Sequence, residues 1–211
     1  MSDHTDPSPG QNKPERLLPE RLSFLLDDRP VLWFEDGDAY DALLAELVAH
    51  YDPKGAIEFM LVKDIADAQW DCVRLRDMRR AAVEVELPRA AQHLIGDTYE
   101  EQTGLSYSEA KASLEGTVRL SIRGNTEARD VLDSYLEATG VTYRMMQYEA
   151  HKFAIKSMTS IEEALARAER RRDQVIRLME DRRKTLDAMS RSLIQQRQTS
   201  IAAAGAIEPA P

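Results

Sequence analysis

The side chains that could bind a metal or act in catalysis are few and scattered along this sequence. The four histidines, His4, His50, His93 and His151, have no metal-ligand spacing, and no glutamate stands three residues before or after any of them. A carboxylate-bridged di-iron site in a helical bundle needs that glutamate–histidine pair on facing helices. The sequence therefore predicts no metal site and no bound cofactor.

Motifs for phosphate binding and hydrolysis are also missing. The chain has no glycine-rich phosphate loop, no nucleophile elbow and no His-Glu-x-x-His helix, and each of these supplies a specific arrangement for its chemistry. Ser108 and Lys111 do have the Ser-x-x-Lys spacing that places an amine one helical turn from a nucleophile. Because the companion motifs are missing, we interpret this match as the start of a surface helix and predict that the protein is not an enzyme.

Glu58 is the strongest single candidate for a general acid or base. It falls among apolar residues, and burial would raise the pKa of its carboxyl group. It also stands in the first turns of a predicted helix, where exposed amide groups and the helix dipole favour an acidic residue, and no second carboxylate follows at a defined spacing. We therefore predict a structural role for Glu58.

The elements that must position these residues are helices. Apolar spacing predicts helices over about 39–51, 56–87, 126–138, 142–157 and 161–198. Asn125 or Thr126 and Gly140 fit the start and stop of the third, and Ser160 with Glu163 forms a capping box that predicts the start of the last. Between Pro88 and Asn125 the pattern is broken by glycines. There we expect a short helix to about Leu114, and then an irregular segment where Val118, Leu120 and Ile122 alternate with polar residues as in a strand.

The helix predicted over about 56–87 is apolar around more than half of its circumference as far as Val73, so it must contact neighbours on two sides. Beyond Arg74 the apolar stripe narrows. Trp70 is the type of residue that anchors a core, and Cys72 is best interpreted as a small buried hydrophobe. The core residues predicted on this helix are Ile57, Leu61, Ile65, Trp70 and Cys72.

The last helix carries a coiled-coil seam, in which positions follow alternating steps of four and three residues. Its members are Ile161, Leu165, Ala168, Arg172, Val175, Met179, Arg182, Leu186, Met189 and Leu193, and from these we predict that Leu165, Val175, Met179 and Leu186 are core residues. The seam must lie along a partner. That partner is either the helix over about 56–87, folded back antiparallel, or the same helix of a second subunit.

Two arginines, Arg172 and Arg182, interrupt this seam. A buried guanidinium without a partner is costly, so it reaches solvent or finds a carboxylate. We predict that one or both form an ion pair with an acidic residue on a facing helix.

The charge of the chain is unevenly distributed. The formal net charge is −9, from 28 basic and 37 acidic residues, whereas basic residues are in excess over 151–200. A net negative chain repels polyanions unless its charges are segregated in this way. No aromatic residues are interleaved with the basic ones, and acidic neighbours dilute them. The candidate interface or phosphate contacts are Arg170, Arg171, Arg182, Arg183 and Lys184.

The organisation predicted for the chain is one helical domain over 17–198. The proline- and glycine-containing residues 1–16 and the alanine-rich residues 199–211 are expected to be disordered. A single cysteine cannot form an internal disulfide, and no apolar run is long enough for a signal core or a membrane span. We therefore expect a cytoplasmic protein that makes no contact with a membrane.

Residues 31–86 also resemble a known group of proteins. The residues that carry the resemblance are Val31-Leu32, Leu43-Leu44-Ala45-Glu46-Leu47, Pro53, Glu58, Leu61-Val62, Ile65-Ala66, Trp70, Arg74 and Arg79. In this pattern, and more weakly in Tyr148-Glu149 and 164–183, the chain is similar to a family of small, uncharacterised bacterial helical proteins. Members of that family often begin with a basic segment rich in glycine and asparagine, which this chain lacks. The resemblance implies a helical fold with a structural Trp/Arg pattern, and it brings no activity, cofactor or catalytic residue.

These observations predict an all-α protein: a helical bundle with a long coiled-coil hairpin, which is antiparallel if the two long helices of one chain pair. The function that we expect is protein interaction, as a non-enzymatic scaffold that binds a protein partner or self-associates through its last helix. The alternative is a DNA-associated accessory protein that uses the arginines of the last helix and of residues 74–80.

Overall fold

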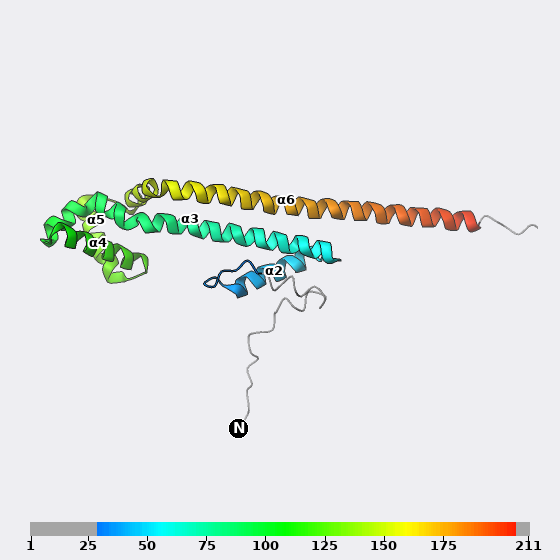
Figure 1. The fold of residues 1–211 in the computed structure, drawn as a ribbon, viewed down its shortest axis with the longest axis horizontal. Coiled ribbons are helices and arrows are strands. Elements are labelled where there is room, and N and C mark those ends of the chain that lie inside the picture. Colours follow the sequence, from blue (N-terminus) through cyan, green and yellow to red (C-terminus); the bar gives the residue numbers. More distant parts are fainter. Residues whose placement is uncertain (1–28, 206–211) are drawn as a thin grey trace, which may run out of the picture. The chain divides into compact units, whose positions relative to one another are not determined.

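The computed structural model describes residues 29–205, with side chains as far as Thr199, and over these residues the chain is helical with no strand (Figure 1). The all-α prediction is therefore confirmed. The arm predicted at 1–16 lies outside the described residues. The helices are α2 (Gly37–Tyr51), α3 (Ala56–Thr103), α4 (Tyr107–Ile122), α5 (Thr126–Thr139) and α6 (Tyr143–Gly205).

Contacts group the chain into two compact units, which we describe separately. In the described part of the chain, unit 1 consists of residues 29–71 and 168–205, and unit 2 consists of residues 72–167. Helices α3 and α6 each contribute a segment to both units. Two contact units can belong to one domain, so the single helical domain predicted over 17–198 stays a prediction.

Unit 1 has its core between α2, the beginning of α3 and α6. Tyr40 and Leu44 of α2, Val62 of α3 and Met179 of α6 are almost completely buried and pack in one cluster. Polar groups fix the edge of this cluster, because the Tyr40 hydroxyl donates a hydrogen bond to Asp67. The Trp70 indole meets the Tyr40 ring edge to face at 5.7 Å, and its Nε1 donates to the Glu35 carboxylate at 3.0 Å. The two long helices are thus tied to α2 and to the residues that precede it.

Unit 2 has a separate core, in which the middle of α3 packs against α4, α5 and the beginning of α6. Leu114 of α4, Leu132 of α5 and Ile95 of α3 are buried there with several small residues of α3 and α6. The direction of packing is antiparallel. The Arg89 guanidinium lies 4.0 Å from the centre of the Phe153 ring, while His93, further along α3, has its Nδ1 3.2 Å from a carboxylate oxygen of Glu149, earlier on α6.

Helix α3 is longer than predicted, because it continues past residue 87 to Thr103 with Pro88 inside it. Proline lacks a backbone N–H and its ring clashes with the preceding turn, which costs about 3 kcal/mol or more in a helix interior. In the structure Pro88 is buried, and Ala90, Ala91 and Ile95 after it are buried in the unit 2 core. Burial of this face offsets the cost of the proline, and such packing depends on helices far away in the sequence.

The two helices predicted over 142–157 and 161–198 are one continuous helix, α6. The capping-box prediction at Ser160 is wrong: Ser160 is an exposed residue inside the helix. No glycine or proline stands between the two predicted helices to end the first one. The prediction of a disordered tail from residue 199 is also wrong for 199–205, which continue α6; residues 206–211 lie outside the described range.

The segment that resembled a strand at 118–122 is the second half of α4. The buried residues of α4 follow one another at steps of four, four and three, which is the spacing of one helix face: Ala110, Leu114, Val118 and Ser121. Alternation over five residues was too short to distinguish the two periods. The predicted caps of α5 are confirmed: the Asn125 side chain accepts from the Ala128 amide, and Gly140 follows the helix with a left-handed φ of 68°.

Burial decides the core predictions. Leu61, Ile65, Cys72, Leu165 and Met179 are buried as predicted. Trp70 and Val175 are partly buried and pack against the unit 1 core.

The core predictions for Ile57 and Leu186 are wrong, because 55% of Ile57 and 41% of Leu186 are exposed. Ile57 lies in the first turn of α3, on a face that the described residues leave uncovered. Leu186 lies on α6 beyond the beginning of α3.

Candidate functional site

The end of helix α6 presents an exposed apolar stripe. Every described side chain from Lys184 to Thr199 is exposed, and the stripe consists of Leu186, Met189, Leu193 and Ile194. Leu186, Met189 and Leu193 continue the three- and four-residue steps of the seam that is buried further back at Met179. In Figure 1 this orange and red end of α6 continues past the cyan beginning of α3.

The packing register explains why the stripe is exposed. Gln69 of α3 contacts Arg172 of α6, and Val62, seven residues earlier, shares the unit 1 core with Met179, seven residues later. This is antiparallel pairing. Another six or seven residues bring α3 back to its beginning at Ala56 and α6 forward to Leu186. The seam therefore loses its α3 partner at Leu186, and over the described residues nothing covers its continuation.

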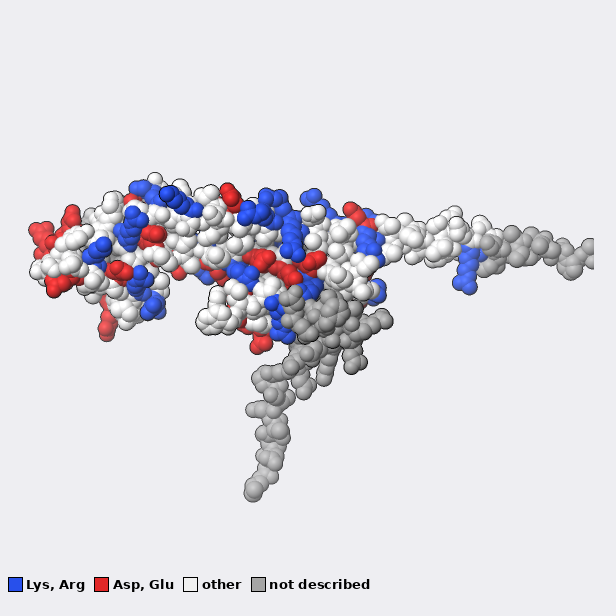
Figure 2. Space-filling view, viewed as in Figure 1, with Lys and Arg blue, Asp and Glu red and all other residues white. Residues whose placement is uncertain are grey.

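The basic residues predicted as phosphate contacts are largely engaged within unit 1. Arg171 is paired with Asp64 of α3 at 3.3 Å, and the Arg183 guanidinium lies 5.7 Å from the centre of the Tyr51 ring. Lys184 is paired with Asp181 at 3.3 Å. Arg170 is exposed. Figure 2 shows acidic and basic side chains interspersed in this region and few charges toward the end of α6.

The two seam arginines behave differently. Arg172 reaches α3 by donating to the Gln69 amide oxygen at 3.0 Å, and it pairs with Asp173 on its own helix at 2.7 Å. Arg182 has a buried Nε atom without a hydrogen-bond partner, and among the residues that the structure describes no acidic side chain pairs with it. The predicted ion pair of Arg182 is therefore not found in the described part of the chain.

The three residues considered for catalysis are Glu58, Ser108 and Lys111, and they lie in different surroundings. Glu58 is buried, and its carboxylate accepts the backbone N–H of Lys54 at 2.9 Å, which ties the turn before α3 to its first helical turn. Ser108 and Lys111 are both exposed on α4. Among residues 29–205, no three His, Cys, Asp or Glu side chains are placed to hold a metal ion.

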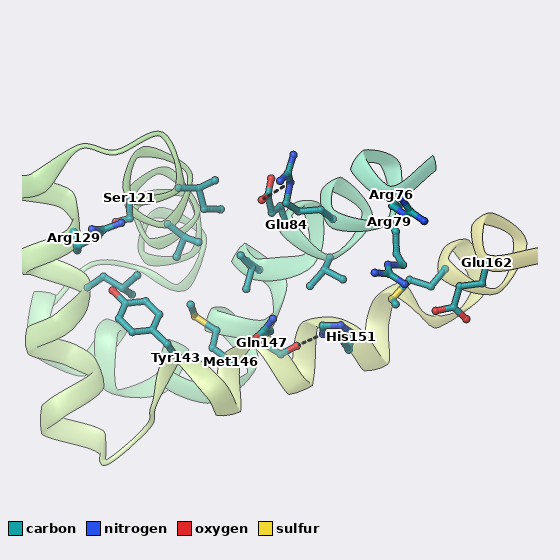
Figure 3. A pocket seen from close by; sticks show the side chains of 17 residues that line it. Arg76, Arg79, Glu84, Ser121, Arg129, Tyr143, Met146, Gln147, His151 and Glu162 are labelled. Atoms are coloured by element: carbon teal, nitrogen blue, oxygen red, sulfur yellow. Dashed lines mark hydrogen bonds and ion pairs between the residues drawn. The ribbon is translucent and has the colours of Figure 1, made fainter. Parts of the chain in front are cut away.

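A second candidate site is a cavity of about 1050 Å³ inside unit 2, bounded by α3, α4, α5 and α6 (Figure 3). Part of its wall is apolar, and the rest carries several arginines together with Tyr143, Gln147 and His151. Sequence reasoning missed this cavity. The one signal for it in the sequence is the arginine cluster at 74–80 of α3, because most of the other lining residues come from α4, α5 and α6.

Several polar groups of the cavity wall are held in place by neighbours. Arg80 pairs with Asp77 at 2.9 Å and lies 4.0 Å from Glu84. The His151 Nδ1 is 2.8 Å from the backbone oxygen of Gln147, one helical turn earlier. Burial, together with a hydrogen bond to Asp133 and the charge of that carboxylate, raises the pKa of Tyr143 to about 12. The Tyr143 hydroxyl is therefore neutral at physiological pH.

Comparison with known proteins adds no assignment, because no family model, no curated protein and no solved structure matches the chain. The similarity to bacterial helical proteins noted above stays an expectation. None of the helices in the part of the chain that the structure describes is long and apolar enough to cross a membrane.

Proposed function

We propose that this chain is a non-enzymatic helical interaction protein that self-associates through the exposed end of α6, residues 186–199. The observation that carries the proposal is the continuity of the seam. The same spacing that buries Met179 against α2 and α3 continues through Leu186, Met189 and Leu193, where α3 has ended. A second copy of this helix offers a stripe of the same spacing to fill that place.

The size of the stripe sets the strength of the association. Burying one large aliphatic side chain contributes about 1.5–3 kcal/mol, and two copies would bury the eight such side chains of their two stripes. Association itself costs about 4–15 kcal/mol, so we expect a reversible dimer in the micromolar range. A helix of fourteen residues without tertiary contacts is marginal in water, and a partner would also stabilise the helix itself.

The charge of this segment favours a second copy over a nucleic acid. Residues 186–199 carry three charged side chains, Asp187, Arg191 and Arg197, so two copies repel each other little. The nearby basic residues Arg183 and Lys184 contact Tyr51 and Asp181. DNA binding, the alternative expected from the sequence, would need these contacts to give way.

Sedimentation equilibrium of the full chain over a range of concentrations tests the proposal. We expect a monomer–dimer equilibrium that Leu186→Glu/Leu193→Glu shifts to monomer. Gln195→Glu/Gln198→Glu adds the same two charges to the same segment off the seam and should leave the dimer unchanged. Far-ultraviolet circular dichroism confirms that each variant is folded.

Three results would overturn the proposal. The first is a wild-type chain that stays monomeric at the highest concentration, and the second is a dimer that survives both seam substitutions. The third is association that requires duplex DNA, weakens steeply with salt and is unaffected by the seam variant, which would favour the DNA-associated alternative.

A further inference from the structure

We propose that two copies of the chain pair antiparallel at the end of α6, so that the helix end of each copy stops at the beginning of α3 of the other. This inference rests on the proposed self-association. It adds the direction of pairing and a second contact surface, the first turn of α3. Two observations carry it: the place that α3 already occupies beside α6, and the positions of the charges within residues 186–199.

The helices that pack against α6 in unit 1 all end at one level. The antiparallel register of α3 and α6 places Ala56, the first residue of α3, opposite about residue 185 of α6. Helix α2 ends at the same level, because the ring of Tyr51, its last residue, lies 5.7 Å from the Arg183 guanidinium. Over the described residues, the seam side of α6 is therefore covered before Leu186 and uncovered after it.

A parallel pair meets an obstacle at this level. Packed helices have axes about 8–10 Å apart, so a second α6 lying along the exposed seam follows the same line as α3. In a parallel pair, the residues before Leu186 of the second α6 continue along that line into the place of α3. They avoid α3 only if the helix bends sharply. Sharp bends arise mainly at proline or glycine, and residues 143–204 of the continuous helix α6 contain neither.

An antiparallel pair avoids the obstacle. The second α6 then runs in the same direction as α3 and ends where α3 begins, and two-fold symmetry makes the relation mutual. The overlap is limited to residues 186–205, which span about 30 Å at 1.5 Å per residue. The carbonyl end of the arriving helix points to the amide end of α3, so the dipoles of the two helices are aligned head to tail.

The charges of the exposed segment favour the same direction. Asp187 lies at its beginning and Arg197 near its end. Antiparallel pairing brings Asp187 of each copy toward Arg197 of the other, whereas parallel pairing brings like charges together. Arg191 lies near the middle and does not distinguish the two directions. Exposed charge pairs contribute little free energy, so they favour a direction while the apolar stripe supplies the affinity.

The second contact surface is held in shape before a partner arrives. The Glu58 carboxylate accepts the backbone N–H of Lys54 at 2.9 Å and ties the turn before α3 to the helix. Ile57, in the same first turn, is 55% exposed and offers the end of the arriving helix an apolar contact. A surface that is already ordered loses little conformational entropy on binding.

Cysteine cross-linking of the full chain measures the direction of pairing. In a Cys72→Ala background, which removes the single native cysteine, Thr185→Cys and Thr199→Cys each place a thiol at an exposed position beside the apolar stripe. The two positions are about 21 Å apart along α6. Antiparallel pairing brings Thr185 of one copy near Thr199 of the other, and parallel pairing brings like positions together. A short bismaleimide joins only thiols that lie close to each other.

The two variants are mixed in equal amounts, and one carries a size tag so that mixed and like-with-like dimers separate on a denaturing gel. We expect mixed cross-links to exceed like-with-like cross-links at least tenfold. Adding Leu186→Glu/Leu193→Glu to both variants should reduce the mixed cross-link to the level of random collisions. That level is given by Gln174→Cys mixed with Thr199→Cys, since Gln174 is exposed on α6 where α3 covers the seam.

Folding of each variant is checked by circular dichroism, and a duplicate set that keeps Cys72, which is buried, controls for the background substitution. Like-with-like cross-links in excess overturn antiparallel pairing and leave self-association standing. A chain that sedimentation equilibrium shows to be monomeric at every concentration overturns both proposals. Both also fail if a dimer forms but no cross-link exceeds the level of the Gln174→Cys control.

Discussion

Replacing Met179 by alanine should destabilise the core of unit 1 by about 2–4 kcal/mol. Met179 is fully buried and packs with Tyr40 and Leu44 of α2 and Val62 of α3. Truncating a buried methionine to alanine loses transfer free energy and leaves a cavity, together about 2–5 kcal/mol. The better helix propensity of alanine returns only a few tenths of a kcal/mol.

Urea unfolding followed by tryptophan fluorescence measures this loss. The chain has two tryptophans, of which Trp33 is almost fully exposed and Trp70 packs against Tyr40 beside the core. In a Trp33→Phe background, Trp70 alone reports on unit 1. Met189→Ala, the same substitution at an exposed seam position, is the control; at concentrations below dimerisation we expect a change within about 0.5 kcal/mol.

A loss below about 1 kcal/mol for Met179→Ala, or equal losses for the two variants, would contradict this packing. Either one would mean that α6 does not pack into the cluster formed by α2 and α3. The register that leaves the end of α6 exposed would then be wrong as well.

Four further substitutions give separate checks. Tyr40→Phe removes the hydroxyl that donates a hydrogen bond to Asp67. It should lower the free energy of unfolding of unit 1 by about 1–2 kcal/mol, measured as a lower urea midpoint. An unchanged midpoint would mean that this hydrogen bond contributes nothing to stability. Folding raises the pKa of Tyr143 to about 12 from its ordinary 10.0. The neutral Tyr143 hydroxyl therefore contributes its full stabilisation below pH 10 and loses it as the pH rises through 12. Spectrophotometric titration of the tyrosines should show a component near pH 12 that is missing in Tyr143→Phe. Gly140→Ala places a side chain at a φ of 68° and should destabilise the protein by about 1–2 kcal/mol. Gly116 lies inside α4 with open space around it, so Gly116→Ala should stabilise the protein by about 0.5–1 kcal/mol. Effects of the same sign would contradict the backbone conformations of these two glycines.

The sequence predicts a structural feature correctly where the interactions that form it join residues close together in the chain. Asn125 and Gly140 mark the two ends of α5, because a side-chain cap and a left-handed glycine act within a few residues of the helix end. The seam of α6 was visible as a period, and Met179 within it is buried as predicted. A periodic apolar stripe indicates that a helix packs against a partner. The sequence is compatible with two partners, α3 of the same chain and a second subunit.

Residue spacing is enough to predict the helical class of the protein and which face of each helix is apolar. Three other features come from tertiary packing: α3 passes through Pro88, the seam pairs with α3 no further than Leu186, and Arg79, Arg129 and Tyr143 line one cavity. Each of these depends on which helix lies opposite. The contacts that select the opposite helix join residues about a hundred positions apart, as Gln69 and Arg172 are joined, and no local pattern records them.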